Sequence, residues 1–166
     1  LKVIGITGTK GKTTTTYMVK SILENAGYKV GLIGTIETII GDHVIPSANT
    51  TPESLLVQKY FREMLDAGCD CAVMEVSSQG LMLHRTAGFT FEIGIFTNIE
   101  PDHIGPNEHS SFEQYLECKK MLLKQCRIGT VNRDDEHFEK IIEGHTCSLE
   151  TYGFSPEADL RAANPK

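Results

Sequence analysis

The first 16 residues, LKVIGITGTKGKTTTT, constrain the fold more than any other stretch of the chain. An apolar run rich in β-branched residues (3–6) leads into a loop with glycines at positions 5, 8 and 11. Lys12 and Thr13 then open a segment with helical spacing. A strand, a glycine-rich turn, a lysine, a hydroxyl and a helix start form the P-loop arrangement. Its backbone N–H groups bind polyphosphate, its lysine reaches the β- and γ-phosphates, and its hydroxyl binds Mg²⁺.

The glycine spacing departs from the common P-loop pattern. That pattern places a glycine five residues before Gly11, where this chain has Ile6. The alternative interpretation is a Gly- and Thr-rich β–α turn with a solvated lysine. Because a predicted strand precedes the loop and a predicted helix follows it, we favour nucleotide binding.

Composition sets the broad class of the chain. Its 166 residues fit one domain, with 40% hydrophobic and 23% charged residues, as in ordinary globular proteins. The net charge of −6 and the lack of a basic cluster argue against nucleic acid binding. No apolar run approaches 18 residues and no basic-then-apolar leader is present, so we expect no membrane insertion and a cytoplasmic location.

The cysteines and the chain ends give two further expectations. The five cysteines contain no C-x-x-C pair, which favours reduced thiols over disulfides or zinc. They are Cys69, Cys71, Cys118, Cys126 and Cys147. The chain starts directly on a predicted core strand and stops without a clear terminal element, so we expect a piece of a longer protein.

Strand and helix patterns alternate along the chain. Helices are predicted over 13–26, ending at Gly27, over 51–67, with Thr51 as N-cap and Pro52 in the first turn, and over 112–125, with Ser111 and Gln114 as a capping box. Met18, Val19, Ile22, Leu23 and Ala26 are the expected buried face of the first helix. Strands are predicted over 29–34, 71–76, 93–97, 130–132 and 146–152, a hairpin over 35–45 turning at Gly41-Asp42, and short helices within 77–88 and 135–142.

This alternation predicts an α/β fold, with a mostly parallel sheet flanked by helices and a small β-hairpin insertion. Ligands of such sheets bind beyond the carboxyl ends of the strands. Three polar groups follow three predicted strands: the loop 8–13, Glu75 with Ser77, and the segment 98–103. We therefore expect them to meet in one site.

Two residues of that site suggest metal chemistry. Glu75 ends an apolar strand and is a candidate Mg²⁺ ligand beside the phosphates, or else a solvated carboxylate. His103 is equally compatible with a ligand role and with a surface position.

Lys119 is unusual because it falls on the apolar face of the predicted helix 112–125, with Phe112, Leu116, Leu122 and Leu123. A buried ammonium must pair, lose its charge or extend outward to solvent. Lys120 and Lys124 are expected to be solvated.

Several stretches together resemble the central ATP-binding domain of the Mur ligases, and within that family the MurE type. They are TGTKGKTT (7–14), NTTP (49–52), EVSSQGL (75–81), FTNIEPDH (96–103), YLECK (115–119), VNRDD (131–135) and ADLRA (158–162). The resemblance covers essentially the whole chain, and it accounts for the unusual glycine spacing. It implies that residues 1–166 form the central domain, with a UDP-binding domain before it and an amino-acid-binding domain after it.

The resemblance also implies residue roles. ATP would be bound by Gly8, Thr9, Lys10, Gly11, Lys12, Thr13, Thr14, Asn98, Asn132 and Asp135. Mg²⁺ would be held by Thr13, Glu75, His103 and a CO₂-derived carbamate on Lys119, and the catalytic set would be Lys12, Lys119 and His103. The muramoyl-peptide substrate would contact Asn49, Thr50, Thr51, Ser77 and Arg85.

The chemistry implied is acyl activation. ATP would phosphorylate the D-glutamate carboxylate of UDP-MurNAc-L-Ala-D-Glu, and the amine of L-lysine or diaminopimelate would attack the acyl phosphate. ADP and phosphate would leave, and the enzyme would act as a monomer. The fragment alone is expected to be inactive.

Three departures from the family pattern bear on substrate details. They are Leu83 in place of a glutamine, Gly105 in place of an aspartate, and a longer interval between His103 and Lys119. A folylpolyglutamate synthase-like ligase and a non-catalytic nucleotide-binding paralogue are the alternatives. The stretches NTTP and EVSSQGL favour the Mur side, and the joint presence of the nucleotide and metal residues argues against a decayed site.

Overall fold

A computed structural model describes residues 1–102, 104–105 and 109–163. Nine strands form one sheet in the order β4-β3-β2-β5-β1-β6-β7-β8-β9. The strands are β1 (Lys2–Thr7), β2 (Val30–Ile33), β3 (Glu37–Ile40), β4 (His43–Pro46), β5 (Cys71–Glu75), β6 (Phe91–Phe96), β7 (Cys126–Asn132), β8 (Ser148–Gly153) and β9 (Leu160–Arg161). The helices are α1 (Lys12–Asn25), α2 (Ser54–Asp66), α3 (Ser78–Met82), α4 (Phe112–Lys124) and α5 (Phe138–Ile142).

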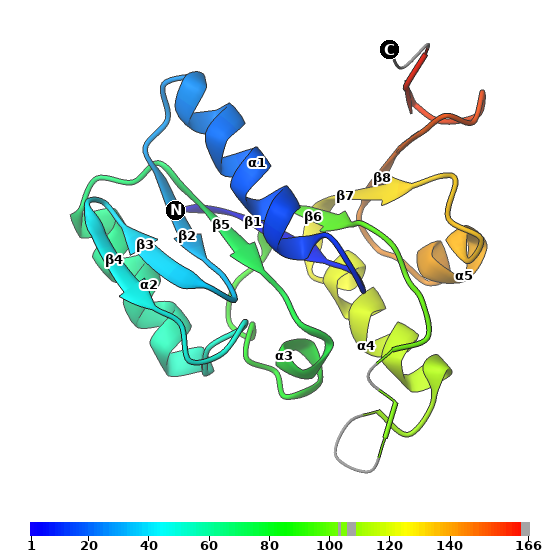
Figure 1. The fold of residues 1–166 in the computed structure, drawn as a ribbon, viewed down its shortest axis with the longest axis horizontal. Coiled ribbons are helices and arrows are strands. Elements are labelled where there is room, and N and C mark those ends of the chain that lie inside the picture. Colours follow the sequence, from blue (N-terminus) through cyan, green and yellow to red (C-terminus); the bar gives the residue numbers. More distant parts are fainter. Residues whose placement is uncertain (103, 106–108, 164–166) are drawn as a thin grey trace.

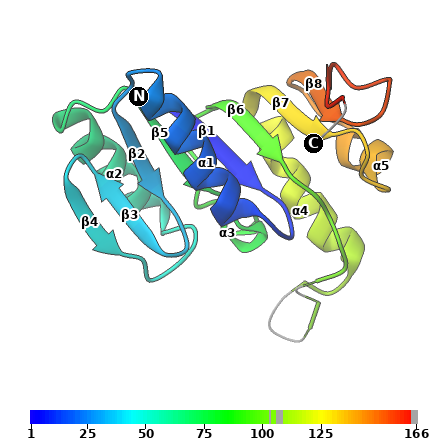
Figure 2. The same ribbon diagram turned by 45° about the horizontal axis from the view of Figure 1, so that its top comes forward.

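In the described chain the pairs from β2 through β5, β1, β6, β7 and β8 to β9 are parallel, whereas β3 pairs antiparallel with both β2 and β4. These two strands form a hairpin around Gly41-Asp42 that extends one edge of the sheet. Helix α1 lies on one face, whereas α2, α3 and α4 lie on the other (Figures 1 and 2). The predicted α/β fold with a hairpin insertion is therefore confirmed. The sequence did not predict β9.

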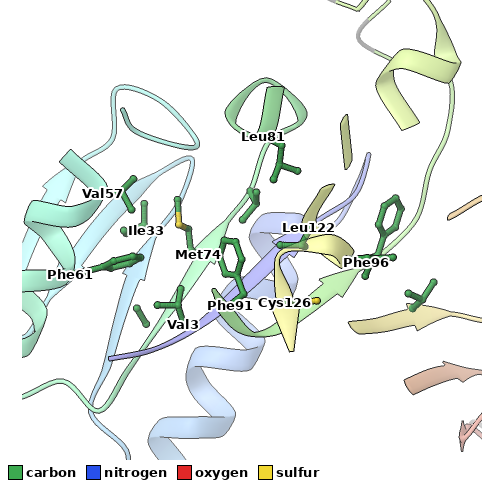
Figure 3. Packing of buried hydrophobic residues seen from close by; sticks show 14 of the residues in the cluster. Val3, Ile33, Val57, Phe61, Met74, Leu81, Phe91, Phe96, Leu122 and Cys126 are labelled. Carbon is green, nitrogen blue, oxygen red and sulfur yellow. The ribbon is translucent and has the colours of Figure 1, made fainter. Parts of the chain in front are cut away.

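The larger core lies between the sheet and the layer of helices α2, α3 and α4. Figure 3 shows Phe61, Leu81 and Leu122, from these three helices, packed over the sheet residues Met74 and Phe91. The opposite core is smaller, because α1 is the one helix in the described chain that covers that face, through Val19 and Leu23. Because both faces of β5 are covered, its side chains are buried without alternation.

Three local predictions are wrong. Of the predicted buried face of the first helix, Met18 and Ile22 are 59% and 65% exposed and Ala26 is exposed too. Val19 and Leu23 do pack on the sheet, and Thr16, which was not predicted, is buried. The N-cap of α2 is Glu53 rather than Thr51, whose hydroxyl bonds inside the fold. The predicted capping box at α4 is only half formed: Ser111 Oγ accepts from Gln114 N, but the Gln114 side chain accepts from Ser110 N.

Lys120 is also buried, at 4% exposure, against the prediction that it is solvated. Its ammonium turns back toward Glu117 Oε1 at 2.5 Å and Glu143 Oε2 at 3.6 Å. The stem of the side chain lies along α4 while the charge reaches these two exposed carboxylates. All five cysteines are free thiols, as predicted.

Candidate nucleotide and acyl-transfer site

The polar strand ends predicted to meet do so at the carboxyl edge of the parallel strands. Strand β1 lies between β5 and β6, with Ile6 in register with Glu75 on one side and with Ile95 on the other. The glycine-rich loop, Glu75 and the segment that starts at Thr97 therefore leave the sheet side by side. The parallel topology alone produces this convergence.

Two glycines give the loop after β1 its shape. Gly8 has φ +148°, and a Cβ there would lie 3.2 Å from both the backbone nitrogen and the oxygen of Asn98. Gly11 has φ +82° and is the N-cap of α1. Both conformations are unfavourable for residues with a side chain, so the loop needs these glycines for its path.

The ammonium of Lys12 turns back onto this loop. Its Nζ donates to Gly8 O at 2.9 Å and to Thr9 O at 3.1 Å. Burial lowers the pKa of Lys12, and the negative charges of Glu75 and Asp102 act in the opposite direction. Lys12, Thr13 and Thr14 line a cavity of about 340 Å³ together with Glu75.

The Asn98 side chain makes two hydrogen bonds to the glycine-rich loop after β1. Its Oδ1 accepts from Lys10 N at 2.9 Å, and its Nδ2 donates to Lys10 O at 3.0 Å. The Lys10 side chain points elsewhere, pairing with Glu100 Oε2 at 2.5 Å. In this conformation the amide of Asn98 holds the loop in place.

Glu75 is fully buried and its carboxylate is surrounded by neutral donors. Oε1 accepts from Thr35 N at 2.9 Å, while Oε2 accepts from the hydroxyls of Thr13 at 2.9 Å and Thr35 at 3.0 Å. Burial of the carboxylate is thus offset by hydrogen bonds rather than by an ion pair. Thr13 and Glu75, predicted to hold one Mg²⁺, thus lie within hydrogen-bond distance of each other, and their role as metal ligands stays a prediction. Thr35 is a partner of Glu75 that the sequence did not reveal.

Lys119 lies on the inward face of α4, as predicted, and is 1% exposed. Its Nζ donates to Gly8 O at 2.8 Å and lies 4.7 Å from the centre of the Tyr115 ring. The same carbonyl therefore accepts from Lys12 and Lys119. Burial, and next the nearby charge of Lys12, hold the pKa of Lys119 well below its usual value.

A second cavity, of about 230 Å³, opens beside these two lysines. Its lining brings together residues from the loop before α2, from α3 and from α4. They are Lys12, Asn49, Thr50, Thr51, Ser77, Ser78, Gln79, Arg85 and Lys119. With three cationic side chains in its lining, the cavity suits an anionic ligand.

Two of the residues predicted to bind substrate have hydroxyls engaged within the protein. Thr51 Oγ1 donates to Glu75 O at 3.1 Å and accepts from Ser77 N at 2.9 Å. Ser77 Oγ accepts from Gly80 N and so caps α3. Arg85 donates to Thr51 O at 3.0 Å and pairs with Glu53 at 2.5 Å. The structure thus gives these side chains a role in shaping the cavity wall.

The segment after β7 lies beside the segment after β6. Both oxygens of Asp135 accept backbone hydrogen bonds, Oδ2 from Ile99 N at 3.1 Å and Oδ1 from His137 N at 2.9 Å. Asn132 Oδ1 accepts from Asp134 N at 3.0 Å. Asp135 therefore joins the two segments. Its predicted contact with the nucleotide stays a prediction, as does that of Asn132.

His103, the predicted second metal ligand, lies outside the described residues. Among the residues that the structure describes, no group of three or more His, Cys, Asp and Glu side chains forms a metal site. A site that uses Thr13, Glu75 and a modified Lys119 has a different donor set.

No helix in the described ranges is long and apolar enough to cross a membrane.

The sequence did not predict that three further residues contact the site: Thr35, Tyr115 and His109. Thr35 directly follows the strand predicted over 29–34, so its place at the carboxyl end of a strand was a usable signal. Tyr115 and His109 are fully buried, and their positions depend on how α4 packs against α3. No local pattern distinguishes such residues from ordinary core.

A family model described as "Mur ligase middle domain" matches residues 6–166. The chain is 51% identical over its full length to UDP-N-acetylmuramoyl-L-alanyl-D-glutamate--2,6-diaminopimelate ligase 1 of Clostridium acetobutylicum. It is 48% identical over 99% of its length to the Clostridium botulinum protein named as the corresponding ligase. The chain spans 34% of the length of each of these curated relatives.

A solved structure of such a diaminopimelate ligase superposes with a TM-score of 0.82 at 27% identity, covering 96% of this chain and 33% of that one. MurF from Acinetobacter baumannii, at 21% identity and a TM-score of 0.71, shares the fold.

Fold and site together define an α/β domain with a glycine-rich, nucleotide-binding type of loop between its first strand and first helix. The chain belongs to the Mur ligase family, whose middle domain it matches over nearly its whole length. The family uses ATP and Mg²⁺. The resemblance predicted from the motifs is confirmed.

Proposed function

We propose that the protein carrying this domain is an ATP-dependent amide ligase of peptidoglycan precursor synthesis. It joins 2,6-diaminopimelate to UDP-MurNAc-L-Ala-D-Glu and releases ADP and phosphate. The names of the relatives support the substrates. We propose further that residues 1–166 are the ATP-binding domain, and that the UDP-binding and amino-acid-binding domains lie outside them.

One observation carries the proposal. Lys12 and the buried Lys119 line the 230 Å³ cavity together with Arg85, and Lys119 also contacts the glycine-rich loop at Gly8 O. Lys12 lines the 340 Å³ cavity as well, together with the buried carboxylate of Glu75, so the two cavities adjoin. A nucleotide triphosphate and an anionic acceptor would then lie next to each other. Transfer of a phosphoryl group to a carboxylate requires that proximity.

For the nucleotide, the loop from Gly8 to Thr14 would bind the polyphosphate, with Lys12 leaving the carbonyls of Gly8 and Thr9 to reach the β- and γ-phosphates. Backbone N–H groups at the start of α1 support such binding. Asn98 would keep the loop in shape, and Asn132 and Asp135 would lie near the adenosine.

The donor set fits Mg²⁺, which prefers oxygen ligands. Glu75 and Thr13 would hold one ion and His103 would serve a second. Because burial lowers the pKa of Lys119, its ammonium loses a proton more readily than that of an ordinary lysine. The neutral amine can then add to CO₂ and lose a second proton to give a carbamate. The carbamate would supply oxygen ligands and remove the buried positive charge. Bound Mg²⁺ would stabilise negative charge on the phosphates.

The acceptor would lie in the 230 Å³ cavity, with Asn49, Thr50 and Ser77 along its wall and Arg85 pairing with an acidic group. Thr51 would act through the position of that wall, since its hydroxyl is engaged. Lys12 would stabilise charge on the γ-phosphate as it passes to the D-glutamate carboxylate. Attack of the diamino acid's amine on the acyl phosphate would then form the amide and expel phosphate.

Phosphate release by the full-length protein tests the proposal, with ATP, Mg²⁺, UDP-MurNAc-L-Ala-D-Glu and either diaminopimelate or L-lysine. We expect release with diaminopimelate and much less with lysine. Equal release with lysine would overturn the amino-acid assignment. Release with a folate substrate instead would replace the ligase assignment, and ATP binding without release from any mixture would indicate a non-catalytic paralogue.

Location and oligomeric state complete the proposal. Five free thiols suit a reducing compartment, which supports a cytoplasmic protein. A monomer is the expected state, and sedimentation of the full-length protein at two concentrations would test it.

A further inference from the structure

His109 is a polar ring at a fully buried position just before α4. Its Nε2 lies 2.8 Å from Ser78 Oγ, so the two side chains share a hydrogen bond. Its backbone oxygen accepts from Gly105 N at 3.1 Å. The hydrogen bond with Ser78 ties the segment before α4 to the first turn of α3.

The His109 ring also packs against the ring of Tyr115. The two ring centres are 5.2 Å apart with a tilt of 55°. The Tyr115 hydroxyl donates to Thr9 Oγ1 at 3.2 Å, and its ring carries the Lys119 ammonium at 4.7 Å. Through Tyr115, the position of His109 is therefore related to the glycine-rich loop and to Lys119.

Ser78 is the first residue of α3 and is itself buried. Together with its neighbours Ser77 and Gln79 it lines the 230 Å³ cavity, and Lys12 and Lys119 belong to the same lining. His109 thus contacts Ser78 in the lining of the acceptor cavity and Tyr115, which in turn contacts Thr9 and Lys119. No role in substrate contact is needed to explain its burial.

We propose that His109 is a positioning residue that sets the separation between the acceptor cavity and the phosphoryl donor. It does so through the hydrogen bond of Nε2 to Ser78 on one side and the packing on Tyr115 on the other. This inference rests on the proposed function. Reactions between two bound substrates are sensitive to such placement, and an error of about 1 Å can cost about 100-fold in rate.

Isosteric variants of the full-length protein separate this role from simple core packing. Glutamine can place a polar group near the position of Nε2, whereas asparagine places one near Nδ1. We expect His109→Leu and His109→Asn to lower kcat for ligation by about 10-fold or more. Loss of residues that orient the ligands of a metal site in other enzymes has effects of this size. His109→Gln should recover most of the rate. The dissociation constant of an ATP analogue should change less than about twofold in all three.

A double-mutant cycle with Ser78→Ala tests the contact itself. If the effect on kcat depends on this hydrogen bond, the fold losses of kcat caused by His109→Leu and Ser78→Ala should not multiply in the double variant. The double variant should then have about the kcat of the slower single variant. The matched control is His145→Leu, which removes a histidine whose Nδ1 contacts Ile142 O at 2.6 Å away from the site. That control should leave kcat unchanged.

Multiplying effects in the cycle would overturn the inference, as would equal rates for the Gln and Asn variants. A parallel loss of ATP affinity would also overturn it, because it would indicate general damage to the fold. If the wild-type protein shows no ligation, the proposed function fails. The role of His109 can then still be tested by hydrogen exchange of backbone amides in α3. The ATP analogue should then slow exchange of the Gly80 and Leu81 amides in the wild type and His109→Gln, and not in His109→Leu. The same slowing in all three would overturn the inference.

Discussion

Thr35 donates both its backbone N–H and its hydroxyl to the carboxylate of Glu75, at 2.9 and 3.0 Å. Glu75 ends β5, and Thr35 lies just after β2, the neighbouring parallel strand. Thr35 immediately follows Gly34, where a Cβ would lie 2.7 Å from Glu75 Oε1. The Thr35 hydroxyl also lies 3.0 Å from that of Thr50, in the lining of the acceptor cavity. Thr35 therefore orients the proposed metal ligand from the short connection between β2 and β3.

Removing this hydroxyl should weaken metal binding. We expect Thr35→Val to raise by about 10-fold the Mn²⁺ concentration that half-saturates the protein in the presence of an ATP analogue, because outer-shell partners orient carboxylate ligands. Electron paramagnetic resonance of free Mn²⁺ measures this directly. Thr35→Ser, which keeps the hydroxyl, should bind nearly as the wild type does.

Thr146→Val is the matched control for that measurement. Its hydroxyl donates to Lys124 O at 3.3 Å, outside the site, and the residue is exposed. The control should bind Mn²⁺ normally. Equal weakening in Thr35→Val and Thr146→Val would show that Thr35 has no particular effect on Glu75.

Replacing the buried amine should stabilise the fold while it removes function. Lys119→Met should raise the free energy of unfolding by about 1–3 kcal/mol in CO₂-depleted, nucleotide-free buffer, since a buried charge without a carboxylate partner opposes folding. Chemical denaturation at pH 7 measures the difference. Ligation should be lost, because no carbamate can form on methionine. A large loss of stability would contradict this account of Lys119.

The same comparison has a pH dependence of known sign. The unfolded chain keeps the Lys119 proton up to about its ordinary pKa of 10.5, whereas the folded chain loses it at lower pH. Between these two values the unfolded state binds more protons, so wild-type stability rises with pH. The advantage of Lys119→Met should therefore be largest at low pH and should shrink as the pH approaches 10.5. An advantage independent of pH would exclude titration of Lys119 as its cause.

Thr51 should act through structure rather than through contact with substrate. Its hydroxyl joins Glu75 O to Ser77 N, so Thr51→Val leaves both backbone groups without this partner and should cost about 1–3 kcal/mol of unfolding free energy. Thr51→Ser should retain most of the stability. Denaturation of both variants, set beside their KM for the UDP-sugar substrate, distinguishes the roles. An unchanged stability with a raised KM would indicate direct substrate contact.

Asp135 should affect nucleotide affinity by ordering two segments. Asp135→Ala removes the hydrogen bonds that its carboxylate accepts from Ile99 N and His137 N. We expect the ATP analogue to bind about 5- to 20-fold more weakly, which corresponds to the typical loss of about 1–2 kcal/mol for such bonds. Calorimetry checks this. Asp135→Asn, which keeps one acceptor oxygen, should show a smaller loss.

Local sequence patterns are sufficient to predict the fold class, the central strand-loop-helix unit and the edge of the sheet at which the site forms. These depend on local signals: β-branched runs for buried strands, Gly8 and Gly11 for the loop path, and alternation that requires a parallel sheet. The inward position of Lys119 was also readable, because helical spacing fixes which residues share a face. The family motifs identified the Mur ligase middle domain.

The polar groups that the site residues contact, in contrast, depend on the packing of distant elements. Thr51 has the pattern of an N-cap, yet its hydroxyl bonds across strands to Glu75 and Ser77. Lys120 has the pattern of a solvated lysine, yet two carboxylates hold it against α4. Thr35 and His109 gain their roles from residues 40 and 31 positions away. Periodicity reports the face of an element, whereas hydrogen-bond partners depend on how distant elements pack, which no local pattern encodes.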